Sequence, residues 1–81
     1  MSLMNLISGQ FPKEDALDIL TRMVHAKISY HEQKIHGSLN EEDIKMRENR
    51  IKQLQKDLYD CRREMDQKEG MIRLSAQLEL A

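Results

Sequence analysis

The most regular hydrophobic pattern in the chain spans residues 41–69. Apolar residues recur there at every seventh position, at Ile44, Ile51 and Leu58, with further apolar positions between and beyond them. This spacing predicts a long helix with a single apolar seam. Asn40 precedes a run of acidic residues and is the expected N-cap, because its side chain can accept hydrogen bonds from the first free N–H groups.

An earlier segment, residues 12–37, has a similar helical periodicity, with apolar residues at steps of three and four. Pro12 favours a first helical turn, and Gly37 is expected to end the helix. Residues 38–40 allow only a short turn, which makes the two helices antiparallel neighbours. The apolar stripes then face each other. The expected core and oligomerisation residues are Leu17, Leu20, Val24, Ile28, Ile35, Ile44, Ile51, Leu54, Leu58, Cys61 and Met65.

The same antiparallel register places His31 opposite Arg47, which inserts a polar layer into an otherwise apolar seam. Such a layer usually fixes the register of a helix pair at some cost in stability. We interpret His31 as a partly buried histidine that needs only a hydrogen-bonding partner. The alternative is a packing switch that responds to pH.

The two ends of the chain carry weaker signals. Residues 1–11 are interpreted as a lead-in, and residues 1–3 look like a vector remnant, which we set aside. Residues 70–81 alternate apolar and polar positions, which is typical of a strand, but they consist largely of good helix formers. We therefore predict an extension of the second helix. An extended tail and a strand paired across a dimer stay open as alternatives.

These patterns predict a single all-α domain over residues 1–81, built as an antiparallel, coiled-coil-like two-helix hairpin. A chain this small buries only about 60% of its unfolded surface and is marginal alone. Several apolar residues also fall outside the seam and predict a second apolar surface for another chain. We therefore expect a homodimer that forms a four-helix bundle, or else another protein partner. The residues outside the seam are Ile19, Met23, Tyr30, Met46 and Tyr59.

Charge and cysteine content narrow the function classes. The formal net charge is −1, so no overall field attracts nucleic acid or a membrane surface. The charge is unevenly distributed, with a net of −3 over residues 1–44 and +2 over residues 45–81. A single cysteine excludes an intrachain disulfide. No apolar run is long enough for a bilayer, so we expect no membrane partner and a cytoplasmic location.

The first helix carries a weak metal-binding pattern. His25, Glu32 and His36 fall on one helix face, and imidazole and carboxylate groups can hold a divalent ion. The spacing differs from the His-Glu-x-x-His motif of zinc proteases. We interpret the set as a solvated face, with a metal-binding bundle as an alternative function and no cofactor expected.

The second helix is basic over residues 45–56, where Lys45, Arg50, Lys52 and Lys56 could touch phosphates. They do not share one helix face, and no aromatic side chain is interleaved for base stacking. A nucleic-acid-associated accessory protein is therefore an alternative function, and nucleic acid is not the expected partner.

No catalytic arrangement is recognisable in the sequence. Cys61 has no histidine that can be placed beside it, and there is no glycine-rich phosphate loop or paired-carboxylate cleft. The sequence therefore predicts a non-enzymatic interaction or assembly module whose specific role it does not identify.

Overall fold

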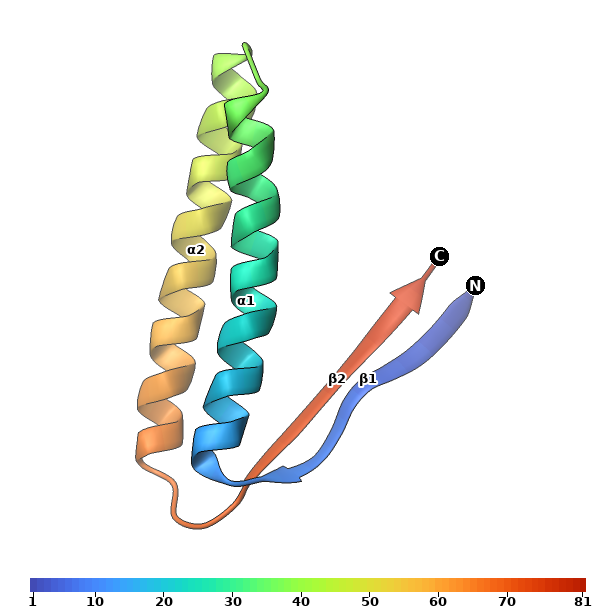
Figure 1. The fold of residues 1–81 in the computed structure, drawn as a ribbon, viewed down its shortest axis with the longest axis vertical. Coiled ribbons are helices and arrows are strands. Elements are labelled where there is room, and N and C mark those ends of the chain that lie inside the picture. Colours follow the sequence, from blue (N-terminus) through green and yellow to red (C-terminus); the bar gives the residue numbers. More distant parts are fainter.

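The computed structural model describes residues 1–81 and contains two helices between two strands. The elements run in the order β1 (Ser2–Phe11), α1 (Lys13–His36), α2 (Glu41–Asp66) and β2 (Ile72–Leu80). The helices form an antiparallel hairpin, and the strands pair antiparallel into a two-stranded sheet, here called the ribbon (Figure 1). The fold is therefore α/β.

The all-α prediction is wrong, and with it the descriptions as a coiled coil and as a four-helix bundle. The second helix ends at Asp66 and does not pass Gly70, and most of its expected extension over residues 70–81 is the strand β2. The lead-in is the partner strand: Ser2 and Leu3, set aside as a vector remnant, pair with Leu80 and Glu79. Strand pairing satisfies the backbone groups along the inner edge of each strand, which outweighs the helix propensity of the tail.

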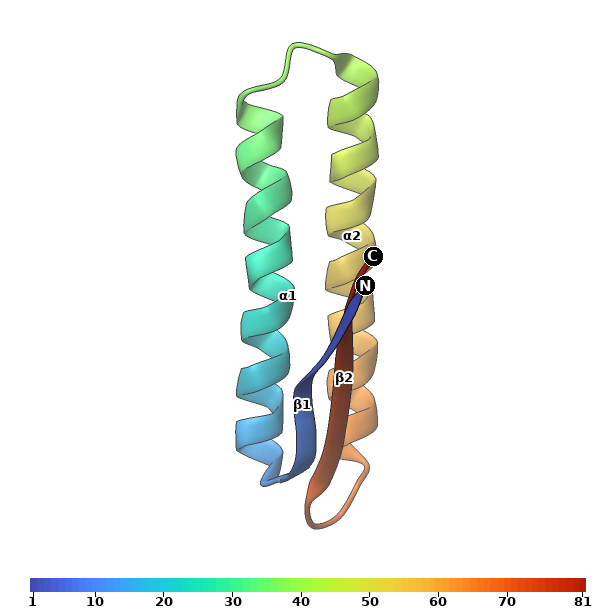
Figure 2. The ribbon, with the colours of Figure 1, turned by 90° about the vertical axis from the view of Figure 1, so that its right-hand side faces the viewer.

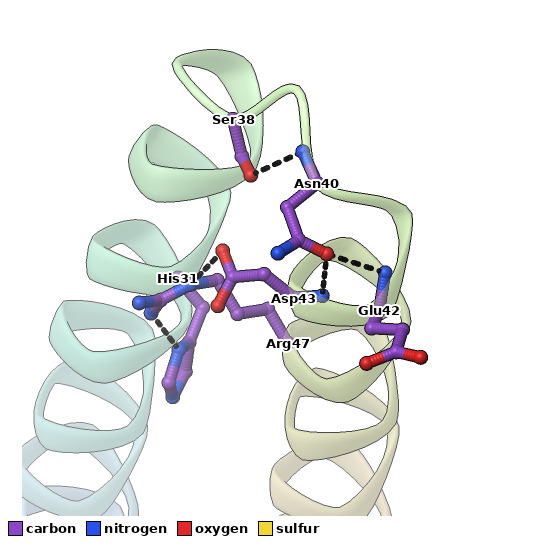
Figure 3. Close-up of polar contacts among 6 residues, drawn as sticks. All are labelled: His31, Ser38, Asn40, Glu42, Asp43 and Arg47. Carbon is purple, nitrogen blue, oxygen red and sulfur yellow. Dashed lines mark hydrogen bonds and ion pairs between the residues drawn. The ribbon is translucent and has the colours of Figure 1, made fainter.

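The turn of the hairpin is fixed by side-chain capping. Asn40 is the N-cap of α2, as predicted, and its Oδ1 accepts hydrogen bonds from the N–H groups of Glu42 at 2.9 Å and Asp43 at 3.2 Å (Figure 3). Ser38 Oγ accepts from the N–H of Asn40 at 3.2 Å. Gly37 has φ −92°, so the first helix ends without the left-handed conformation that a glycine at this position often supplies.

The connection from α2 to β2 does use that conformation. Gly70 has φ +78°, which residues with a side chain adopt only with strain. It lies between the cap of α2 at Gln67 and the first residue of β2, where the chain turns back beneath the helices. The turn directs β2 onto β1 and gives the chain its sharp change of direction (Figure 1).

The core is small and lies where the ribbon meets the hairpin. Ala16, Met65 and Ile72 form the buried cluster there, which we call the base. The half-buried side chains packed around it are Phe11, Leu17, Leu20 and Leu74. From the base the ribbon diverges from the helices, so that both chain ends lie away from the hairpin (Figure 1). Seen from the side, the helices lie next to each other and the ribbon crosses in front of them (Figure 2).

Candidate interaction surface

The two faces of the ribbon differ in chemistry. In β2 the buried Ile72 and the half-buried Leu74 and Ala76 alternate with exposed polar residues. Because successive side chains of a strand point to opposite faces, Leu78 and Leu80 belong to the same face as Ile72. We call this the helix-facing face. Its members in β2 are Ile72, Leu74, Ala76, Leu78 and Leu80.

A β-bulge in β1 keeps the apolar residues on both sides of it on the helix-facing face. The register shifts between Asn5 and Ile7, so that Leu6 is the extra residue. On either side of it, Ile7 is paired with Ala76 and Met4 with Leu78. Without the shift, Asn5 would have taken the apolar position and Met4 the polar one, since a slip of one residue exchanges the faces. The bulge therefore extends the helix-facing face to the end of β1.

Only the lower half of this face is covered. Near the base it packs toward α1, where Ile19, Leu20 and Met23 line a hollow together with Ile7 and Leu74. Ile19 and Met23 are two of the apolar residues that lie outside the helix seam, so this chain's own ribbon partly covers them. Beyond Ala76 the ribbon leaves the helices. On this face the large apolar side chains left exposed at the tip are Met4, Leu78 and Leu80. Leu3, on the other face, and Leu6, in the bulge, are exposed there as well.

The exposed area of the molecule shows how incomplete this covering is. The accessible surface is 6759 Å². A compact monomer of the same mass, 9.6 kDa, would expose about 5,100 Å², so the excess is about 1,700 Å². The radius of gyration is 15.2 Å, against about 12 Å for a compact chain of this length. The single chain thus lacks a second layer over much of its apolar surface.

The helix seam holds the remaining buried residues, and it includes the polar layer. Ile28 and His31 are buried, and Arg47 Nη1 donates a hydrogen bond to His31 Nδ1 at 3.1 Å (Figure 3). Arg47 Nε lies 3.2 Å from Asp43 Oδ2 and forms an ion pair with it. The Tyr30 ring meets His31 edge-on at 5.5 Å and lies 5.7 Å from the Arg47 guanidinium.

One atom of this layer has no partner. Because a guanidinium only donates, Nδ1 of His31 accepts and the ring proton lies on Nε2. Nε2 is buried and makes no hydrogen bond. A buried donor without a partner costs free energy, so the layer is a weak point in an otherwise apolar seam.

The other expected core residues lie along the seam with different exposures. Half-buried positions are Leu17, Leu20, Val24, Ile35, Ile44, Ile51, Leu54 and Leu58. Met65 is buried at the base. Cys61 is a free, exposed thiol, and it lines a hollow beside β2 and not the centre of the seam.

The metal-binding candidates do not form a ligand set. No group of three or more His, Cys, Asp or Glu side chains is placed to hold a metal ion. Glu32 and His36 line one shallow hollow with Ile35 and Ile51, whereas His25 lies outside it.

The candidate basic residues of α2 lie on its solvent-exposed surface. Lys45, Arg50, Lys52 and Lys56 are exposed, and Lys56 Nζ lies 3.7 Å from Asp60 Oδ2. Neither helix combines the length and the apolar character required to cross a membrane.

Comparison with family models, curated proteins and solved structures gave no match. The function is therefore inferred from the geometry of this chain alone. Sequence reasoning missed the tip of the ribbon as a surface, although the alternation of residues 72–80 was its signal.

Proposed function

We propose that this chain is a non-enzymatic protein–protein interaction module that self-associates through the helix-facing face of its ribbon. The observation that carries the proposal is the exposed apolar half of that face, from Met4 and Leu78 to Leu80. Contiguous apolar surface of this kind marks interaction sites, because water solvates it poorly. The excess accessible area of about 1,700 Å² falls in the range that one subunit buries in an obligate dimer.

The cytoplasm is the proposed location. Support comes from Cys61, a free thiol exposed on α2, since unpaired thiols persist in reducing compartments.

The test compares two leucines on opposite faces of the same ribbon. Leu78 is 51% exposed on the helix-facing face, and Leu3 is 61% exposed and paired with Glu79 on the other face. Light scattering over a range of concentrations should give a defined oligomer for the unaltered chain. Leu78→Ser should raise its dissociation constant about tenfold or more, because each subunit loses one buried leucine contact. Leu3→Ser should leave the constant within about threefold.

The same experiment can contradict the proposal. A monomer at every concentration, or equal effects of Leu78→Ser and Leu3→Ser, would show that the helix-facing face is not an interaction surface.

A further inference from the structure

The two outer edges of the ribbon are unequal. Each strand of a two-stranded sheet pairs on one side only and leaves a row of backbone N–H and C=O groups without a strand partner. β1 is interrupted by its bulge at Leu6 and followed directly by Pro12, and it bends along its length (Figure 1). β2 contains no proline, glycine or lysine and is straight. Bulges and prolines protect sheet edges, so β2 is the edge open to another strand.

The sequence of β2 is complementary to itself in one register. Its midpoint is Ala76, so two copies paired antiparallel over the whole of Ile72–Leu80 place Ala76 opposite the partner's Ala76. That register sets Arg73 opposite the partner's Glu79, and Glu79 opposite the partner's Arg73. A shift of two residues in either direction shortens the ladder and separates these charges. Length and charge therefore select the same register, and opposite charges across strands stabilise it.

Within one chain, Arg73 and Glu79 have no oppositely charged partner. Within the ribbon, Arg73 is paired with Gln10 and Glu79 with Leu3, so neither has an oppositely charged neighbour across the sheet. The ion pairs of the chain lie on the helices and include neither residue.

The same pairing covers the exposed tip. A two-fold axis perpendicular to the ribbon keeps both helix-facing faces on one side of the joined sheet. It also reverses the second strand, so that each tip lies beside the base of the other copy. Leu80 then lies opposite the partner's Ile72, and Leu78 opposite the partner's Leu74.

The base offers a hollow at this place. It has a volume of about 380 Å³ and lies along the outer side of β2, between the strand and the end of α2. Most of its lining is apolar. The apolar lining residues are Leu20, Cys61, Met65, Met71, Ile72 and Leu74. Leucine side chains from a neighbouring strand end match the apolar chemistry of this lining.

We infer that two copies of this chain join along β2, in the register centred on Ala76, to form a continuous four-stranded sheet with both helical hairpins on one side. This inference rests on the proposed function and names its partner as a second copy. Each tip fills the hollow at the other's base, which provides the second layer that the single chain lacks.

The first experiment reverses the charges. Sedimentation equilibrium would be measured on the unaltered chain, on Arg73→Glu, on Glu79→Arg and on the double variant. Each single change places like charges opposite each other twice in one dimer, so the dissociation constant should rise about tenfold or more. The double variant restores opposite charges and should return to within about threefold. Lys52→Glu, on the exposed surface of α2, controls for net charge and should have little effect.

A second experiment tests the register directly. In the Cys61→Ala background, which removes the other thiol and keeps the lining of the hollow apolar, Ala76→Cys places two thiols opposite each other at the two-fold axis, within the distance that a disulfide spans. Mild oxidation should give a covalent dimer. Ser8→Cys in the same background lies on β1, away from the joined edge, and should remain monomeric under denaturing conditions.

The outcomes separate the inference from the proposed function. If Leu78→Ser weakens the oligomer but charge reversal shows no rescue and Ala76→Cys no crosslink, the copies meet elsewhere and only the inference is overturned. A chain that is monomeric at every concentration overturns both, and it leaves the β2 edge to a strand of a different protein. Rescue by the double variant together with the crosslink supports the inference.

Discussion

The helical hairpin and the ribbon are of similar length but are held in place differently. α1 extends about 36 Å and β2 about 30 Å at their usual rises per residue. The hairpin is supported along its whole length by the seam, with Asn40 capping the turn and Ile28 buried midway. The ribbon touches the helices only near the base, and its tip has no layer against it. Each helix of the hairpin thus has a partner along its length within one chain, whereas the tip of the ribbon has none.

The largest effect is expected at the base, where the ribbon packs against the hairpin. Ile72 is only 4% exposed and packs against Ala16 and Met65. Ile72→Ala should lower the free energy of unfolding by about 3 kcal/mol, through lost burial and the cavity left behind. Urea unfolding followed by circular dichroism measures this. Leu80→Ala is the matched control, since Leu80 is 67% exposed, and at concentrations below association it should change the free energy by less than about 0.5 kcal/mol. Equal losses for the two variants would mean that the base is not the joint between ribbon and hairpin.

The next effect distinguishes the two turns of the chain, at Gly37 and Gly70. A Cβ atom would meet nothing within 4 Å at Gly37 or Gly70, so only backbone conformation distinguishes them. Gly70→Ala forces alanine into a left-handed conformation and should cost about 1–2 kcal/mol. Gly37 has ordinary right-handed angles, so Gly37→Ala should stabilise the fold by about 0.4–1 kcal/mol by restricting the unfolded chain. Thermal unfolding of both variants checks the signs, and the same sign for both would contradict the account.

The last effect lies inside the hairpin. His31→Leu removes the buried Nε2 donor that has no partner, and Arg47 keeps its ion pair with Asp43. We expect removal of this donor and the added apolar burial to outweigh the hydrogen bond that Arg47 Nη1 loses, so the free energy of unfolding should rise by about 1 kcal/mol. Chemical unfolding measures it. His31→Ala is the control, because it removes the same donor without restoring apolar volume and should therefore be less stable than His31→Leu. A loss of stability in His31→Leu would show that the bond to Arg47 is worth more than the orphaned donor costs.

The same contrast explains what the sequence could predict. The hairpin depends on signals that lie close together in the chain, such as the cap at Asn40, the short turn and the repeating apolar seam. The contact of His31 with Arg47 follows from the same register. These signals are local or nearly so, and each agrees with the others.

The ribbon depends on signals that are distant or hidden. Its strands lie at opposite ends of the chain, so neither has a neighbouring partner in the sequence to indicate a hairpin. In β1 the bulge at Leu6 places two apolar residues in succession, Leu6 and Ile7, and so interrupts the alternation expected of a strand. In β2 the alternation is regular, but Leu, Ala, Gln and Glu are helix formers. The pairing of β2 with β1 stabilises the strand over the helix that these residues favour locally.

The pairing of Ser2 with Leu80 also makes the ribbon a long-range loop closure. For a flexible chain, bringing such distant segments together has an entropic cost that grows with the logarithm of the loop length. Once α1 and α2 have formed, however, most of the intervening residues are rigid and fold back on themselves. The flexible part of the loop is then reduced to the few residues around Gly70 and to Pro12. The folded hairpin therefore holds the two chain ends close together, and this lowers the entropic cost of pairing the two strands.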